Sequence, residues 1–307
     1  MMIGRFLIRR FLWMIVTLWV VFTVSFFLMR AVPGGPFDRE RQLDPQVEAN
    51  LRARYNLDKP LWYQYLSELA KVAQGDLGYS YRLGDFRVSE IILQGLPISV
   101  AVGVVGLGVA IALGLSAGCI SAAWRGSAVD VALMILATVG IALPSFVIAA
   151  MMIILFVFLI PLFPAAGWGS WYHLILPGFC VGAPYAASIA RLARTALLEI
   201  MSQDYIRTAY AKGLGKSGVV LRHGMKLALL PVISYLGPAA AGILTGSVVV
   251  EKIFCLPGLG VHFVEAATQR DYTLAMGLIL TYTVLLFVLN TIVDVCYRLL
   301  DPRVEIA

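Results

Sequence analysis

One short stretch has the residue types that could bind phosphate, Gly215-Lys216-Ser217. A phosphate-binding P-loop also needs a glycine five residues before this Gly-Lys pair, and it follows a β-strand. Tyr210 stands at the glycine position, and no strand-like segment precedes it. The sequence therefore predicts that this chain binds no nucleotide, and nothing else in it predicts a cofactor.

Metal-binding and catalytic patterns are not found either. The histidines lie in separate polar segments and the cysteines have no metal-type spacing, so we predict no metal site. The cysteines are interpreted as small apolar packing residues. Hydrolase motifs and paired aspartates within apolar runs are missing, which predicts that the chain is not an enzyme. The histidines and cysteines are His173, His223, His262, Cys119, Cys180, Cys255 and Cys296.

The most informative polar segment is 191–226, which is highly charged for this chain. Its middle predicts a short helix over about Gln203–Gly213. Ser202 can cap the first turn, and Asp204 interacts favourably with the positive helix end. Gly213 can adopt the left-handed conformation that commonly ends a helix.

A helix of about ten residues is unstable alone in water, so contacts must hold this one. Ala209 and Ala211 are small enough to permit close docking in a groove, and Arg207 and Lys212 can pair with acidic groups. We therefore predict that the helix is held by docking against another surface.

The composition places these residues in a membrane protein. The chain of 307 residues is 60% hydrophobic and only 14% charged, whereas soluble domains carry about 25% charged residues. The apolar residues form long uncharged blocks, which is the signature of membrane spans. The net charge is +6. Because the basic residues flank these blocks, we interpret them as setting orientation, and we predict no nucleic-acid partner.

The uncharged runs predict an all-α integral membrane protein with about six transmembrane helices, since about 20 residues span a bilayer. The first run is too long for a signal peptide, so we predict an uncleaved first helix. The predicted spans are 11–29, 98–123, one long helix 131–160, 174–190, 227–250 and 272–293.

The distribution of basic residues predicts that both termini are cytoplasmic. The short segments on the opposite side hold only Lys252 and Arg270, which satisfies the positive-inside rule. The long loop is then an extracytoplasmic cap with two helices, from Asp44-Pro45 to Tyr55 and from Asp58 to Gly75. The predicted parts are the first helix 1–30, the cap 31–95, the core 96–300 and the tail 301–307.

Small residues and prolines within the spans predict a tightly packed bundle with kinked helices. The G-x-x-x-G pairs are Gly114/Gly118, Gly178/Gly182 and Gly242/Gly246, and the prolines are Pro144, Pro177, Pro184, Pro231 and Pro238. Asp294 lies four residues before Arg298, so we interpret it as half of a helical ion pair. No other predicted span carries an acid or base near its middle, which disfavours a proton-coupled secondary carrier.

The sequence resembles the permeases of bacterial ABC importers, most closely the B-type subunits of oligopeptide and dipeptide permeases. The resemblance covers nearly the whole chain. It rests on residues 207–214, Leu221-Arg222-His223, Leu229-Leu230-Pro231-Val232, Arg9-Arg10, Pro33-Gly34-Gly35-Pro36-Phe37, Gly75-Asp76-Leu77-Gly78, Pro144-Ser145-Phe146, Leu256-Pro257-Gly258-Leu259-Gly260 and Asp301-Pro302-Arg303. Tyr210 departs from the pattern, because peptide permeases usually have Arg there.

The resemblance implies a fold, a location and partners. The fold is that of a type I importer permease in the cytoplasmic (inner) membrane of a bacterium, in contact with lipid. The partners are a second homologous permease subunit, two ABC ATP-binding subunits that hold ATP and Mg²⁺, an extracytoplasmic substrate-binding protein and a peptide substrate. Metal chelates and wall-derived peptides use similar permeases, so the substrate stays open, and a secondary carrier or a scaffold subunit is the alternative outside the family.

The resemblance also implies two sites. The coupling helix that docks the ATPase corresponds to Gln203, Asp204, Tyr205, Ile206, Arg207, Thr208, Ala209, Tyr210, Ala211, Lys212, Gly213 and Leu214. A candidate loop for contact with the binding protein comprises Glu251, Phe254, Pro257, Gly258 and Gly260. The alternative for the loop is a structural turn fixed by its proline and glycines.

Overall fold

The computed structural model describes residues 2–32, 46, 50, 53, 55–84 and 86–300. Within these residues the secondary structure is helical, with turns and loops between the helices and one isolated antiparallel bridge between Tyr79 and Arg87. The chain forms two compact units: residues 1–97 with 258–287, and residues 98–257 with 288–307. The core predicted as one domain, 96–300, is therefore divided, because the chain returns to the first unit after Pro257.

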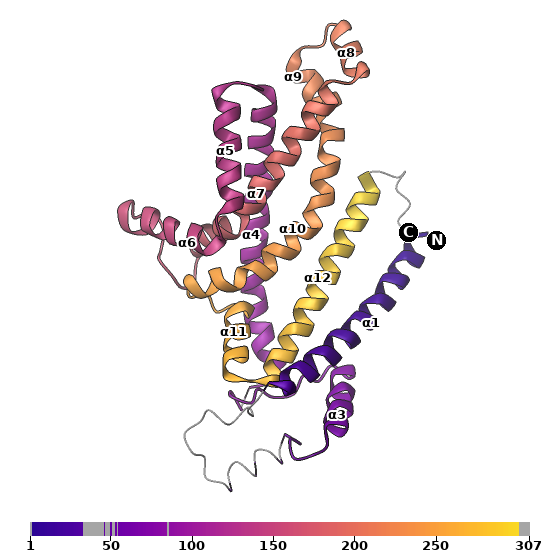
Figure 1. Cartoon of the computed structure of the whole chain (residues 1–307), viewed down its shortest axis with the longest axis vertical. Helices are drawn as coiled ribbons and strands as arrows, with labels where there is room; N and C mark the ends of the chain where they lie inside the picture. Colours follow the sequence, from indigo (N-terminus) through magenta and orange to yellow (C-terminus); the bar gives the residue numbers. More distant parts are fainter. Residues whose placement is uncertain are drawn as a thin grey trace. The chain divides into compact units, whose positions relative to one another are not determined.

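Five helices are long and apolar enough to cross a membrane, and a bent pair brings the total to six. All five correspond to predicted spans, and the all-α fold is confirmed for the described residues (Figure 1). They are α1 (Met2–Ala31), α4 (Val88–Ala123), α7 (Tyr172–Met201), α10 (Met225–Ile253) and α12 (Tyr272–Leu300).

The prediction of one long helix over 131–160 is wrong. The structure has α5 (Ala128–Ala142) and α6 (Ser145–Ile153), the latter extended by a π-helical segment, η1 (Ile154–Leu159). The two halves meet at an angle of 110°. Pro144 has no N–H and disfavours helical backbone at the preceding residue, and Leu143 is accordingly extended, with φ −84° and ψ 126°.

Other elements also differ from the prediction. Helix α4 begins at Val88 and includes Pro97, so the cap ends earlier than residue 95. Helix α7 continues to Met201, so the predicted loop 191–226 is helical in its first part. Helix α11 (Leu259–Gln269) was not predicted as a separate element.

The first unit is held together by two apolar clusters. Phe22 and Phe26 of α1 pack with Met276 and Leu280 of α12, and the start of α4 packs with α11 and α12. Helix α3 (Leu61–Ala73) is the second predicted cap helix; it starts after Pro60 and is followed by Gly75 at φ +79°. The first predicted cap helix lies largely outside the described residues.

The second unit is built around α7, which contacts α5, α6 and α10 (Figure 1). Glycines bring α4 against α7: a Cβ on Gly118 would lie 2.6 Å from the Ala190 carbonyl oxygen, and one on Gly114 would lie 2.7 Å from that of Ala186. A Cβ on Gly182 would likewise collide with the Gly106 backbone. The predicted close packing is therefore confirmed for the pairs Gly114/Gly118 and Gly178/Gly182.

Candidate functional site

The predicted short helix exists as α8 (Asp204–Ala211), beyond the end of α7 (Figure 1). Its N-cap is Gln203 in extended conformation, and Ser202 instead ends α7, its hydroxyl donating to the Glu199 carbonyl at 2.6 Å. The predicted Ser202 cap is therefore wrong. Gly213 has φ +81°, and its N–H donates to the Tyr210 carbonyl at 2.9 Å, as predicted for a glycine that ends the helix.

One face of α8 is anchored to its own chain. Ile206 is fully buried and Ala209 is 7% exposed, and both pack with Val219 and with the end of α7 at Ile200 and Met201. This burial explains how so short a helix is stable. It also identifies the groove that receives Ala209, since its methyl group faces α9 (Lys216–Val219) and α7 of its own chain.

The opposite face of α8 is exposed. Arg207 donates from Nη1 to Asp204 Oδ1 at 3.3 Å, but these side chains are 76% and 94% exposed. Such a pair is easily exchanged for a partner's charges, because solvent screens it. The other exposed residues of the predicted site are Gln203, Tyr205, Thr208, Tyr210, Ala211, Lys212, Gly213 and Leu214. The exposed face of α8 thus combines positive charge, aromatic rings and hydroxyl groups, and the buried face of the same helix holds its backbone in place.

A partly buried ion pair holds α7 behind this surface. Arg194 donates from Nε and Nη2 to the two carboxylate oxygens of Asp130, each at 2.8 Å. Asp130 also accepts from the Ser121 hydroxyl and from the Gly126 N–H, the latter at 2.9 Å. Sequence reasoning missed this network, although Ser127, which caps α5 at Asp130, marked the turn.

The candidate contact loop at 251–260 is mostly buried. Glu251, Phe254, Gly258 and Gly260 are buried, and only Pro257 among the five predicted residues is exposed. The Ser247 hydroxyl donates to Glu251 at 2.8 Å, and the Phe254 carbonyl accepts from the Gly167 N–H at 2.9 Å. The Glu251 side chain is therefore bonded within α10, and the Phe254 carbonyl joins the end of α10 to the segment at Gly167.

The turn before α12 is organised around Asp271, which is 1% exposed. Its carboxylate accepts from the Ser80 hydroxyl, from the Arg82 N–H at 3.2 Å and from the Leu274 N–H at 3.0 Å. The Thr273 hydroxyl donates to the Tyr79 carbonyl at 2.7 Å. Segment 79–82 is thereby fastened to the start of α12 within the first unit.

The remaining sequence features stay outside any chemical site. Within the described residues, no three His, Cys, Asp or Glu side chains are grouped as metal ligands. Gly215-Lys216-Ser217 follows the helix α8 and begins the short helix α9, which is not a P-loop context. The predicted pair of Asp294 involves the Arg298 side chain, which lies outside the described part.

Comparison with known proteins identifies the family to which the chain belongs. Residues 110–306 match the family described as the binding-protein-dependent transport system inner membrane component, and residues 2–103 match its N-terminal model. The oligopeptide transport system permease protein OppB of Escherichia coli (strain K12) is 42% identical over 98% of this chain and 99% of its own.

Two further relatives agree. OppB of Haemophilus influenzae is 41% identical over 98% of this chain and 99% of its own. The dipeptide transport system permease protein DppB of Bacillus subtilis is 42% identical over 99% of this chain and 98% of its own. A family match over most of the residues and relatives of equal length leave one conclusion: the chain belongs to the inner-membrane components of binding-protein-dependent transport systems.

Proposed function

We propose that this chain is a permease subunit of an ATP-driven importer for oligopeptides or dipeptides. It translocates peptides across the cytoplasmic membrane of a bacterium, with both termini on the cytoplasmic side. The similarity to oligopeptide and dipeptide permeases over almost the full length supports the substrate class. The observation that carries the proposal is the exposed face of α8 on a helix anchored from beneath.

This geometry suits the transmission of motion from an ATP-binding subunit. The exposed face of α8 docks in the partner, with Arg207 and Lys212 meeting acidic groups. Ile206 and Ala209 connect α8 to α7, and Arg194 connects α7 to Asp130 at the start of α5. Closure of the ATP-binding subunits would then displace α7 together with the helices packed on it.

The other subunits follow from this assignment. A second homologous permease completes the translocation path, two ATP-binding subunits hold ATP and Mg²⁺, and an extracytoplasmic binding protein delivers the peptide. Long stretches of α1 expose large apolar side chains, including Trp13, Val16 and Leu28, and suit contact with lipid or with the second permease.

Affinity purification tests the proposal. The tagged chain is solubilised from native membranes in mild detergent, and co-purifying proteins are identified by mass spectrometry. We expect a second permease and a P-loop ATPase. A chain that is recovered alone even after crosslinking would overturn the importer assignment.

Two variants test the docking face. Arg207→Glu should lower ATPase recovery by about tenfold, since a like charge then meets the acidic partner. Gly213→Pro should do the same, because proline cannot adopt φ +81° and lacks the N–H that bonds Tyr210. Arg125→Glu, at an exposed arginine in the α4–α5 turn, is the control and should retain recovery. Equal recovery from all three variants would assign the docking to another surface.

A further inference from the structure

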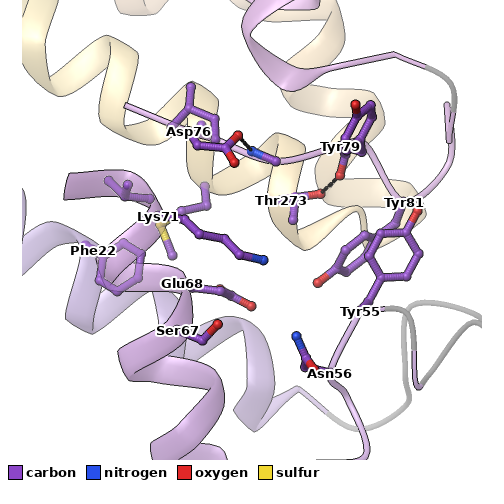
Figure 2. Close-up of a pocket in the computed structure, with 15 residues that line it drawn as sticks. Phe22, Tyr55, Asn56, Ser67, Glu68, Lys71, Asp76, Tyr79, Tyr81 and Thr273 are labelled. Atoms are coloured by element: carbon purple, nitrogen blue, oxygen red, sulfur yellow. Dashed lines mark hydrogen bonds between the residues drawn. The ribbon is translucent and has the colours of Figure 1, made fainter. Parts of the chain in front are cut away.

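The first unit contains a cavity of about 270 Å³ that no step of the proposed function uses (Figure 2). Its walls come from α1, α3, the start of α12 and segments near residues 55 and 76–81. One side is apolar and is formed by Phe22, Val72, Leu77 and Met276. This volume is at the small end for ligand pockets and suits one amino-acid residue better than a longer chain.

Two opposite charges face this cavity from one side of α3. Glu68 and Lys71 are three residues apart, so they lie next to each other on the helix, and both point into the open space in Figure 2. Arg30 Nη2 donates to Glu68 Oε1 at 2.7 Å, while the Glu68 side chain stays 24% exposed. Among the described residues, the Lys71 ammonium has no ion-pair or hydrogen-bond partner.

The facing wall is aromatic and fixed in position. The rings of Tyr55 and Tyr81 lie 4.4 Å apart, and Tyr81 is 7% exposed. Burial raises the pKa of Tyr81, so its phenol stays neutral. The second acid of the cavity, Asp76, is already engaged, since its Oδ1 accepts from the Gly78 N–H at 3.0 Å.

These groups select a ligand by its chemistry. A simple anion would meet Glu68, and a simple cation would meet Lys71. A group that places a cation and an acceptor oxygen side by side satisfies both, and an attached apolar side chain fills the remaining space. The amino-terminal residue of a peptide has this arrangement, with its α-ammonium next to its carbonyl oxygen.

We propose that this cavity binds the amino-terminal residue of a peptide. The α-ammonium contacts Glu68, the carbonyl oxygen accepts from Lys71, and the side chain packs against Phe22 and Met276. The site rests on the proposed function for its substrate class. It adds a contact point for peptide on this chain, apart from the helices that surround α7.

Binding by the full-length chain in phosphatidylglycerol nanodiscs tests this site. The probes are the tripeptide Leu-Gly-Gly and its N-acetylated form, measured by saturation-transfer NMR. We expect the free tripeptide to bind and acetylation to weaken it by about tenfold, the usual effect of losing a charge-assisted hydrogen bond. Lys71→Gln should weaken binding of the free tripeptide by a similar factor.

The control is Lys59→Gln, which removes an exposed lysine that pairs with Asp58 outside the cavity. It should bind like the unaltered chain. Equal binding of the acetylated peptide, or unchanged binding by Lys71→Gln, would overturn the proposal. Loss of peptide binding when phosphatidylethanolamine is added to the nanodiscs would assign the cavity to a lipid ammonium group instead.

This experiment is independent of ATPase docking. A chain that co-purifies with its ATPase but shows no peptide binding refutes only the cavity. A chain that binds the tripeptide but recovers no partner refutes the importer assembly and leaves the cavity in place.

Discussion

Three glycines in α4 and α5 allow a graded test of how closely these helices pack against α7, by adding one methyl group at each. A Cβ on Gly108 would meet no atom within 4 Å, whereas one on Gly140 of α5 would lie 3.2 Å from the Ala187 side chain. One on Gly118 would lie 2.6 Å from the Ala190 carbonyl oxygen and 2.7 Å from Ala193 Cβ. All three substitutions add the same methyl group, so they differ only in the strain that it causes. The strain is largest at Gly118, because a backbone carbonyl cannot rotate away as a side chain can.

The expected free energies of unfolding follow from two opposing effects. Replacing glycine by alanine within a helix stabilises it by up to about 1 kcal/mol. Forcing a methyl group into a packed contact costs roughly 1–3 kcal/mol, and a clash with backbone lies at the upper end. Gly108→Ala should therefore stabilise by up to about 1 kcal/mol, Gly140→Ala should be nearly neutral, and Gly118→Ala should destabilise by about 2 kcal/mol.

Reversible unfolding in bicelles, measured by steric trapping, can rank the three variants in the purified chain. Circular dichroism before unfolding would show whether each variant keeps its helices. If Gly118→Ala were as stable as Gly108→Ala, the two helices would not be in backbone contact at this level, and the account of α4 and α7 would fail.

Three further predictions concern polar groups. Asp130→Asn and Arg194→Met should each lower the melting temperature, since each single change leaves a partner unpaired. The double variant should lower the melting temperature by less than the sum of the two single effects. Additive effects would contradict the ion pair. Asp271→Ala should lower the free energy of unfolding by about 3 kcal/mol, because buried N–H and hydroxyl donors lose their acceptor. It should also expose segment 79–82 to protease, and unchanged proteolysis would contradict the role of Asp271 in holding this segment. Burial raises the pKa of Glu68 above its ordinary value of 4.5, despite Arg30. The stability that Glu68 contributes is therefore present below pH 4.5 and is lost as the pH rises through the raised pKa. As the pH rises through this range, the melting temperature of Glu68→Gln should increase relative to that of the unaltered chain. A relative decrease would mean that the ion pair with Arg30 outweighs desolvation.

Local signals in the sequence predicted the elements well. The uncharged runs predicted the apolar helices, since few other structures are so uniformly apolar. Asp204 and Gly213 predicted α8, because helix ends have their own chemistry. Pro144 predicted a kink, but an apolar run has no polar face that reports how far the chain turns, so the sequence did not predict a bend of 110°.

Contacts between distant segments were beyond the sequence. Asp130 and Arg194 are 64 residues apart, and nothing local marks them as partners. The groove that receives Ala209 could not be identified for a related reason: an amphipathic helix can bury its small residues in its own chain or in a partner, and only the fold decides. Glu251 was likewise placed in an exposed loop because α10 was expected to end at Val250, whereas it continues to Ile253.

The length of α7 gives its ion pair a mechanical meaning. The helix has 30 residues and is therefore roughly 45 Å long. Arg194 lies about 10 Å from the end that leads to α8 and about 33 Å from Tyr172. A helix that pivots at Arg194 is a lever with arms in a ratio of about one to three. A displacement of α8 by about one ångström would then move the Tyr172 end of α7 by about three ångströms. Bending of the helix at Pro177 and Pro184 would reduce this movement.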